Sequence, residues 1–228
     1  MRARYLIVLI VVWGLKMKMS VFGFRTEHFL RSLLIGVAYF LALAIPMFAV
    51  SFTLIYTYTG HLLITGLNTL SILIIFPFMT FCVGISEEGL FRGFIQVKLA
   101  RVISERKALL IQALLFGAWH FIWHVAPFDF VGMAIYIFIT FIFGLLFGQF
   151  FKEGRNLVPI ILAHGLVDTI GYGTILNPNL NITDALVQSA EVVSYIIGFV
   201  ILALSTNFLA KKARIPTTIK ETQTSNQT

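Results

Sequence analysis

The sequence predicts an all-α fold, a polytopic transmembrane helix bundle, and three observations lead to this prediction. Of the 228 residues, 58% are hydrophobic and only 12% are charged, whereas a soluble domain is about 25% charged. Six apolar stretches approach or exceed the length of a membrane span, and the cationic residues occupy alternate connecting segments. These features exclude a cytosolic enzyme, a disordered chain and a disulfide-stapled secreted module. A single cysteine, Cys82, permits no internal disulfide.

The predicted helix bundle occupies residues 33–210. A membrane-spanning helix needs about 20 mostly apolar residues to cross about 30 Å of hydrocarbon. Stretches that meet or approach this length cover residues 33–56, 70–97, 108–125, 130–151, 157–172 and 187–209.

The two ends of the chain differ from the bundle. Residues 1–32 contain a short hydrophobic segment at residues 5–15, followed by a basic cytosolic linker. This segment fits a signal-peptide core, a truncated seventh span or an interfacial helix, but the lack of a small-x-small cleavage site argues against its removal. Residues 211–228 form a basic and then polar cytosolic tail, whose composition from Thr217 onward is typical of disorder.

Cationic residues predict the orientation of the bundle. The outer segments near residues 57–61, 126–129 and 173–190 contain no Lys or Arg. This bias is typical of a multi-pass protein of the cell membrane with its basic loops and C-terminus in the cytosol. The net charge of +7 therefore reflects topology, and no nucleic acid partner is expected. The cytosolic cations are Lys16, Lys18, Arg25, Arg31, Lys98, Arg101, Arg106, Lys107, Lys152, Arg155, Lys211, Lys212, Arg214 and Lys220.

The first polar cluster lies inside the second apolar stretch, in the run Ser-Glu-Glu-Gly-Leu-Phe-Arg-Gly at residues 86–93. Ionisable residues inside spans are costly and usually mark function. Glu88 and Arg92 are i,i+4 neighbours in the order that favours an ion pair, so we expect a structural pair. Glu87 projects about 100° away from Glu88 and stays available as a proton acceptor. The alternative, that both acids cap a helix end, is disfavoured because apolar residues continue to Val97.

Histidines form the second and third clusters. His120 and His124 share a helix face at i,i+4. We expect His124, near the outer surface, to be an interfacial residue, and His120, one turn deeper, to belong to a site. His164 and Asp168 also lie at i,i+4, in the middle of a short span. Asp168 there either orients His164 or forms a buried structural pair with it.

The depth of these residues in the bilayer indicates that the three clusters meet. At 1.5 Å per residue, Glu87 lies about 16 Å, His164 about 13 Å and His120 about 19 Å from the nearest cytosolic cation in sequence. Three alternately oriented helices therefore bring their polar groups to one level of the membrane. We expect a single site on the cytosolic side of the midplane or close to it.

The residue types narrow the chemistry of this site. No His-Glu-x-x-His run of a zinc peptidase is present. An aspartyl peptidase needs a second membrane aspartate beside Asp168. Gly84-Ile85-Ser86 resembles half of a nucleophile elbow, but Glu88 replaces the second glycine. A carboxylate and two histidines that act on water, free or metal-bound, remain.

Three motifs in this order resemble those of the CPBP family, which comprises type II CAAX prenyl endopeptidases and bacteriocin-processing or immunity proteins, also called the Abi family. The motifs are Glu87-Glu88-x-x-x-Arg92, Phe116-x-x-x-His120 and His164-x-x-x-Asp168. The resemblance covers residues 84–172, and the ordered combination is far more specific than any single motif. It implies a membrane-embedded hydrolase, an endopeptidase.

The resemblance also implies the roles of the site residues. Glu87 with His120 activates the attacking water, and His164 with Asp168 stabilises the tetrahedral oxyanion. The third motif of the family often ends in Asn, where this chain has Asp168. An ionised carboxylate cannot donate to an oxyanion, so Asp168 is either protonated or acts by holding His164 as a donor.

The family has also been described as metalloproteases, and two histidines with a carboxylate form a plausible zinc set. Any metal would have Glu87, His120 and His164 as ligands. We favour a glutamate-type peptidase without a cofactor, and the zinc enzyme stays open as the alternative.

The implied substrate is a membrane-associated peptide or a lipidated protein, whose lipid stays in the bilayer while the peptide reaches the site. A non-catalytic bacteriocin-immunity or binding protein on the same fold is the main rival. A transporter is disfavoured because the chain has no matching halves and its polar groups cluster at one depth.

Overall fold

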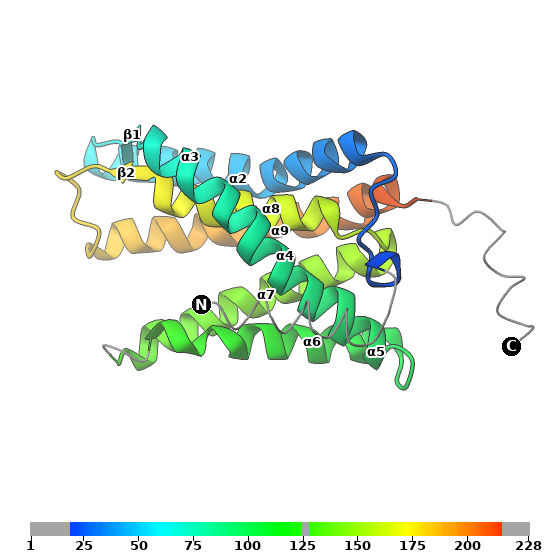
Figure 1. Cartoon of the computed structure of the whole chain (residues 1–228). Helices are drawn as coiled ribbons and strands as arrows, with labels where there is room; N and C mark the ends of the chain where they lie inside the picture. Colours follow the sequence, from blue (N-terminus) through cyan, green and yellow to red (C-terminus); the bar gives the residue numbers. More distant parts are fainter. Residues whose placement is uncertain (1–18, 125–127, 216–228) are drawn as a thin grey trace, which may run out of the picture.

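The computed structural model describes residues 19–124 and 128–215, which form an all-helical bundle apart from one small β-ribbon (Figure 1). The bundle helices are α2 (Phe29–Thr59), a composite helix over Thr69–Leu99, α6 (Glu105–Trp119), α7 (Phe130–Gly154), α8 (Val158–Gly173) and α9 (Ala185–Ala213). The composite helix consists of α3 (Thr69–Pro77), the π-helical η2 (Phe78–Gly84), α4 (Ile85–Glu88), the π-helical η3 (Gly89–Gln96) and α5 (Val97–Leu99). Two short 3-10 turns are η1 (Met19–Phe22) and η4 (His120–His124). The predictions for residues 5–15 and 217–228 concern segments outside the described residues.

The predicted transmembrane bundle is confirmed, and four helices are long and apolar enough to span a membrane: α2, the composite helix, α7 and α9. The other two of the six predicted spans are shorter. α8 has 16 residues, about 24 Å at 1.5 Å per residue, against about 30 Å of hydrocarbon. α6 has 15 residues, because the chain tightens at His120 into η4 instead of continuing as an α-helix to residue 125.

Local sequence explains where the helices begin and end. The side chains of Asn68, Ser104, Asp129 and Asp184 accept hydrogen bonds from backbone N–H groups in the first turns of α3, α6, α7 and α9. Such caps satisfy donors that the helix itself leaves unpaired. α2 ends at Gly60, whose φ of 71° is the left-handed conformation that a glycine adopts without strain.

The composite helix crosses between two groups of helices (Figure 1). α2 packs along α8 and α9 on one side of it, and α6 packs along α7 on the other. The first part of the composite helix, α3 and η2, contacts α8, whereas its later part, η3, contacts α6. α4 therefore lies where the helix passes from one group to the other.

Aromatic and aliphatic side chains fill the core between α2, α7, α8 and α9. Tyr39 is fully buried, its ring lies 4.7 Å from that of Phe150, and its hydroxyl hydrogen-bonds Thr206 Oγ1 over 3.0 Å. The outer surfaces of the helices remain strongly apolar, for example at Leu73 and Ile74, which are 67% and 65% exposed. An exposed apolar surface of this extent fits contact with lipid.

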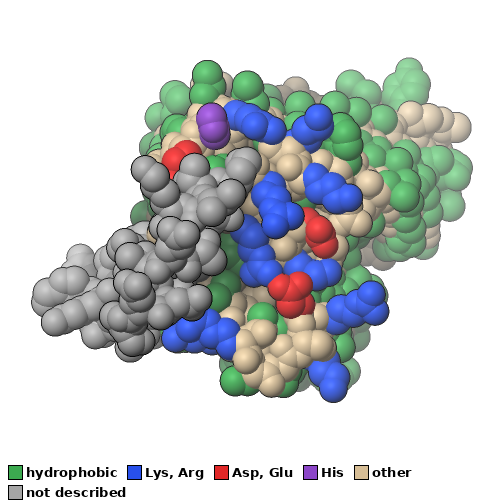
Figure 2. All heavy atoms as spheres, turned by 90° about the vertical axis from the view of Figure 1, so that its right-hand side faces the viewer, with side chains coloured by type: hydrophobic (Ala, Val, Ile, Leu, Met, Phe, Trp, Pro, Cys, Tyr) green, Lys and Arg blue, Asp and Glu red, His purple; other side chains and the backbone are tan. Residues whose placement is uncertain are grey.

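A two-stranded antiparallel ribbon closes one end of the bundle. β1 (Ile64–Leu67) pairs with β2 (Thr174–Leu176) and ties the α2–α3 connection to the α8–α9 connection. The opposite end gathers Lys and Arg side chains, as Figure 2 shows. The described cations in the helix ends and connections of that end include Arg31, Lys98, Arg101, Arg106, Lys107, Lys152, Arg155, Lys211, Lys212 and Arg214.

Candidate active site

The site forms where α4, α6 and α8 meet. α8 can lie directly against η2 because residue 165 is a glycine: a Cβ atom there would sit 2.1 Å from Thr80 Oγ1 and 2.6 Å from Thr80 Cα. This close approach brings the neighbouring residue, His164, next to α4. Ser86, Glu87 and Glu88 are the buried residues of α4.

Glu88 has two partners on one oxygen atom. Its Oε1 lies 3.0 Å from Arg92 Nη1 and 2.7 Å from His164 Nδ1. The guanidinium of Arg92 also stacks over the ring of Phe116, 4.1 Å from its centroid. Glu88 and Arg92 are both fully buried, and a buried charge is tolerated only when it is paired. The ion pair predicted from the sequence is present, and Glu88 in addition hydrogen-bonds His164, a contact that the sequence did not reveal.

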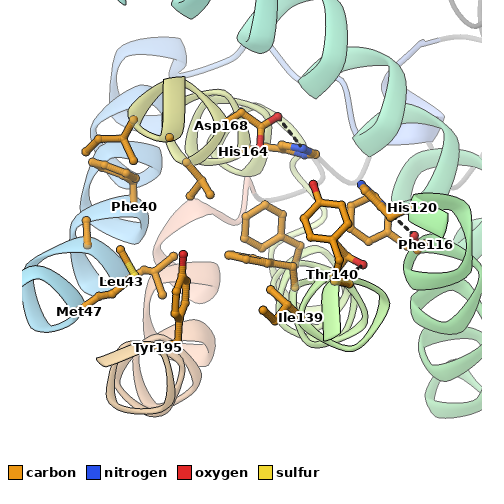
Figure 3. Close-up of a pocket in the computed structure, with 17 residues that line it drawn as sticks. Phe40, Leu43, Met47, Phe116, His120, Ile139, Thr140, His164, Asp168 and Tyr195 are labelled. Atoms are coloured by element: carbon orange, nitrogen blue, oxygen red, sulfur yellow. Dashed lines mark hydrogen bonds and ion pairs between the residues drawn. The ribbon is translucent and has the colours of Figure 1, made fainter. Parts of the chain in front are cut away.

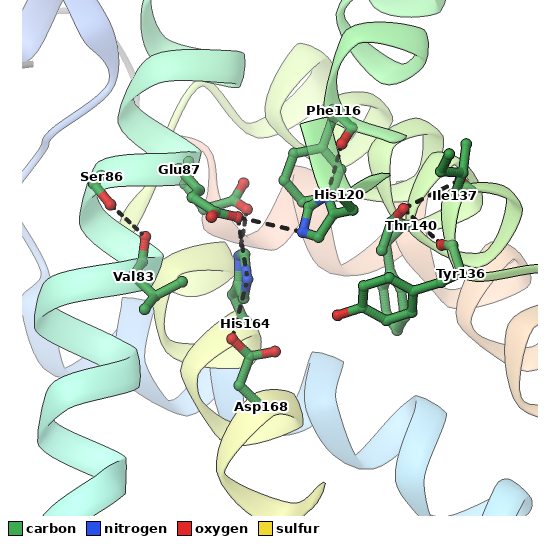
Figure 4. Close-up of polar contacts among 12 residues, drawn as sticks. Val83, Ser86, Glu87, Phe116, His120, Tyr136, Ile137, Thr140, His164 and Asp168 are labelled. Carbon is green, nitrogen blue, oxygen red and sulfur yellow. Dashed lines mark hydrogen bonds and ion pairs between the residues drawn. The ribbon is translucent and has the colours of Figure 1, made fainter. Parts of the chain in front are cut away.

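Glu87 faces both histidines (Figure 4). Its Oε2 lies 3.7 Å from His120 Nε2 and 3.9 Å from His164 Nε2. Both distances exceed that of a direct hydrogen bond. Within the described part of the chain, this buried oxygen has no hydrogen-bond partner. A buried carboxylate oxygen without a partner is rare in proteins and calls for a functional explanation.

The Nδ1 atom of each imidazole lies within hydrogen-bond distance of an acceptor oxygen. His120 Nδ1 lies 2.7 Å from the carbonyl oxygen of Phe116, and His164 Nδ1 lies 2.7 Å from the Glu88 carboxylate. Because these oxygens only accept, each Nδ1 carries the proton. Both Nε2 atoms are therefore directed at Glu87, and in a neutral ring each is an acceptor.

Asp168 lies one helical turn beyond His164, with Oδ2 3.5 Å from His164 Nε2 and a side chain 31% exposed. This contact is longer than the one from Glu88, so Glu88 orients the ring and Asp168 contributes charge beside it. The sequence left two roles open for Asp168, orienting His164 or forming a structural pair with it, and it did not reveal the contact of Glu88 with this ring.

A cavity of about 210 Å³ opens beside these groups (Figure 3). His120, His164 and Asp168 lie on its wall, while Phe40, Leu43 and Met47 of α2 form much of its apolar lining. Tyr195 extends into it from α9. Its walls come from α2, α6, α7, α8 and α9, so the two histidines and Asp168 border a largely apolar chamber, whereas Glu87 lies behind the histidines and does not line it.

The structure thus brings together Glu87, His120, His164 and Asp168, which the sequence placed on three separate segments. The expectation that the three polar clusters meet agrees with these contacts. The side chain of His124 lies outside what the structure describes, so its predicted interfacial role stays a prediction.

Two aromatic residues were missed as site residues. The ring of Tyr136 in α7 lies 5.6 Å from that of His120 and lines the cavity. Phe116 was noted only as part of a motif, but its ring contacts Arg92, lies 4.7 Å from His120 and 6.2 Å from His164. For Tyr136, the sequence signal that could have revealed a site residue was its polar hydroxyl group within an apolar stretch.

Glu87 lies slightly farther from the two histidines than a zinc ion bound by all three side chains requires. Zinc–ligand bonds of about 2.0–2.1 Å place the donor atoms of a tetrahedral site about 3.3 Å apart, whereas the Glu87–histidine separations are 3.7 and 3.9 Å. Among the residues that the structure describes, no group of three or more His, Cys, Asp or Glu side chains is arranged to hold a metal ion.

Comparison with known proteins finds one similarity. Residues 69–170 match a family model described as type II CAAX prenyl endopeptidase Rce1-like. This segment runs from the start of α3 into the last turns of α8 and includes Glu87, Glu88, Arg92, His120, His164 and Asp168. No curated protein and no solved structure matches the chain.

Proposed function

We propose that the chain is a CPBP-family intramembrane protease of the CAAX type, as the Rce1-like match over residues 69–170 supports, and that it hydrolyses a peptide bond with water activated by Glu87 and His120. The observation that supports this mechanism is the buried Oε2 of Glu87, which faces the Nε2 atoms of two histidines at 3.7 and 3.9 Å without a direct hydrogen bond. At such distances a water that hydrogen-bonds both groups lies to one side of the line between them.

The proposed reaction begins with proton transfer to Glu87. A water between Glu87 Oε2 and His120 Nε2 gives one proton to the carboxylate, its oxygen attacks the scissile carbonyl carbon, and a tetrahedral oxyanion forms. Because the N–H of His120 is engaged with Phe116, its Nε2 accepts the second hydrogen of the water and aligns the oxygen for attack. The proton on Glu87 then passes to the scissile nitrogen, the oxyanion returns to a carbonyl as the C–N bond breaks, and the amine leaves.

His164 is proposed to stabilise the oxyanion. Its Nδ1 donates to Glu88, so Nε2 donates to an oxyanion only when the ring is an imidazolium, in which both nitrogens carry protons. Carboxylates of Glu87, Glu88 and Asp168 all lie within 4 Å of its ring nitrogens and compensate a positive charge there. In this proposal Asp168 acts through His164 and needs no proton of its own.

The proposed substrate is a membrane-associated peptide. The family suggests that this peptide belongs to a lipidated or prenylated protein. The apolar chamber lined by α2 and α7 provides room for apolar substrate groups beside the histidines. A non-catalytic immunity or binding protein on the same fold is the alternative, and it requires neither a base nor an aligned water.

The first prediction concerns the base. Glu87→Gln should lower peptide cleavage by at least about 10³-fold, because an amide cannot accept the proton from water. Purified variants in bilayer nanodiscs would be assayed with a library of quenched fluorescent peptides, free and prenylated. Glu153→Gln, a carboxylate at the end of α7 that contacts Gln149 and Lys152, is the matched control. Full activity in a folded Glu87→Gln variant would reject the proposed base.

A second prediction concerns metal. We propose that catalysis needs no cofactor, so a chelator-treated enzyme should keep its rate of cleavage. The measurement combines elemental analysis of the purified protein with cleavage assays before and after chelation. A stoichiometric ion whose removal stops turnover, and whose return restores it, would establish a metalloprotease instead.

A further inference from the structure

A second cavity of about 150 Å³ lies deeper toward the β-ribbon end of the bundle. It is lined by residues of α2, α8, α9 and the two strands. Among them are three polar side chains that the proposed reaction does not use: Ser51, Glu191 and Ser194.

The two cavities are adjacent and share part of their lining. Met47, Ile170, Gly171 and Tyr195 line both. At Gly171, a Cβ atom would meet no other atom within 4 Å, so no side chain fills the space at this shared wall. Along α8 Gly171 is seven residues from His164, about 10 Å. An extended peptide advances about 3.3 Å per residue, so the second cavity begins about three residues from the scissile bond.

The polar side chains of the second cavity make few hydrogen bonds with the rest of the described structure. Ser51 is only 3% exposed, and its Oγ has no hydrogen-bond partner in the described structure. Ser194 bonds within its own helix, from Oγ to the carbonyl oxygen of Glu191 over 2.7 Å. A buried hydroxyl without a partner, on the wall of a cavity that also holds a carboxylate, points to a polar ligand.

The charge of this region favours a cation. No described Lys, Arg or His forms an ion pair with Glu191. The described Lys and Arg residues occupy the opposite end of the bundle, apart from Arg92, which is paired with Glu88. The connection between α8 and α9, residues 174–184, contains no Lys or Arg. A carboxylate in a partly buried pocket without a cation of its own attracts a positive charge and repels a negative one.

We propose that the second cavity is a substrate subsite for a basic side chain, in which Glu191 pairs with a Lys or Arg of the bound peptide and Ser51 contacts the same group. This inference rests on the proposed peptidase function and adds its specificity. The subsite lies about three residues from the scissile bond, and it disfavours a free C-terminal carboxylate at that position.

The test uses a host peptide with Lys, norleucine or Glu placed in turn at each of the four positions on either side of the scissile bond. Wild type should cleave the Lys peptide at least about tenfold better than its norleucine partner at one position, since hydrogen bonds to charged groups contribute about 1.5–3 kcal/mol. Glu191→Gln should bring the Lys-to-norleucine ratio of kcat/KM close to one, Glu191→Asp should retain part of it, and Glu153→Gln should leave it unchanged.

A second set of variants keeps the test decisive if Glu191→Gln does not fold. Gly171→Leu should fill the space at the shared wall and remove the Lys preference. Ser51→Ala should reduce it by a smaller factor. A ratio near one for wild type at every position, or a Lys preference that survives Glu191→Gln and Gly171→Leu, would overturn the subsite.

Binding separates failure of the subsite from failure of the peptidase. Fluorescence anisotropy with the Glu87→Gln variant in nanodiscs measures the affinity for the same labelled peptides without turnover. Tighter binding of the Lys peptide than of the norleucine peptide supports the subsite even if wild type cleaves nothing, which would reject the peptidase. Cleavage with equal binding of both peptides rejects the subsite alone.

Discussion

At the residue scale, the site depends on how two adjacent glutamates are used differently. Glu88 is fully buried and bonded to Arg92 and His164 through one oxygen, whereas Glu87 Oε2 faces the two Nε2 atoms without a direct bond. Removing one partner of a buried pair typically costs about 3–5 kcal/mol. We therefore expect Glu88 to be required for structure and ring orientation, which leaves Glu87 available for the proposed proton transfer.

A third prediction tests Asp168 at this scale. Asp168→Asn should keep kcat within about tenfold of wild type, because an amide can itself donate to an oxyanion while a carboxylate acts only through His164. Asp168→Leu should lower kcat about 10²-fold, the usual effect of losing one oxyanion contribution, with a smaller change in KM. Steady-state kinetics on one peptide measures both constants. Wild-type kcat in Asp168→Leu would show that the carboxylate takes no part in stabilising the oxyanion.

At the scale of elements, the composite helix and α8 position the glutamates. π-Helical segments flank α4 on both sides, at Phe78–Gly84 and Gly89–Gln96, and such segments are frequent at functional sites. Within α4 itself successive side chains project about 100° apart, and here Glu88 meets His164 while Glu87 faces both histidines. The glycine at position 165 lets α8 approach η2 closely enough for these contacts.

A fourth prediction follows from this close approach. Gly165→Ala places a methyl group against Thr80, which should lower stability by about 1–3 kcal/mol and displace His164 from Glu88, so that cleavage falls. Thermal unfolding in detergent and the peptide assay measure the two effects. Gly171→Ala on the same helix, where a Cβ has open space, is the control for thermal stability. If Gly165→Ala leaves both the melting temperature and the rate of peptide cleavage unchanged, the close approach of α8 to η2 is not needed for stability or activity.

At the scale of the whole molecule, the basic end and the ribbon end define two faces. Lys and Arg side chains gather at one end (Figure 2), and the β1–β2 ribbon lies at the other (Figure 1). From the positive-inside bias we propose that the basic end faces the cytosol. In that orientation the proposed subsite lies on the outer side of the histidines, because the second cavity is lined by both strands of the ribbon.

A fifth prediction tests the orientation. In a Cys82→Ser background, single cysteines would be introduced as His61→Cys at the ribbon end and as Lys107→Cys and Lys211→Cys at the basic end. A membrane-impermeant maleimide should label only His61→Cys in intact cells and all three after lysis. Labelling of Lys107→Cys or Lys211→Cys in intact cells would reverse the assigned topology.

The sequence alone determined the helical membrane bundle and the residue types of the site, because hydrophobic length and the cost of buried charge act locally along the chain. It also indicated that Glu87, His120 and His164 lie at one depth. Tertiary packing decided what depends on distances between helices. It made Glu88 the partner of His164, brought Tyr136 beside His120, and placed Glu191 in a cavity that no spacing along a single helix reveals.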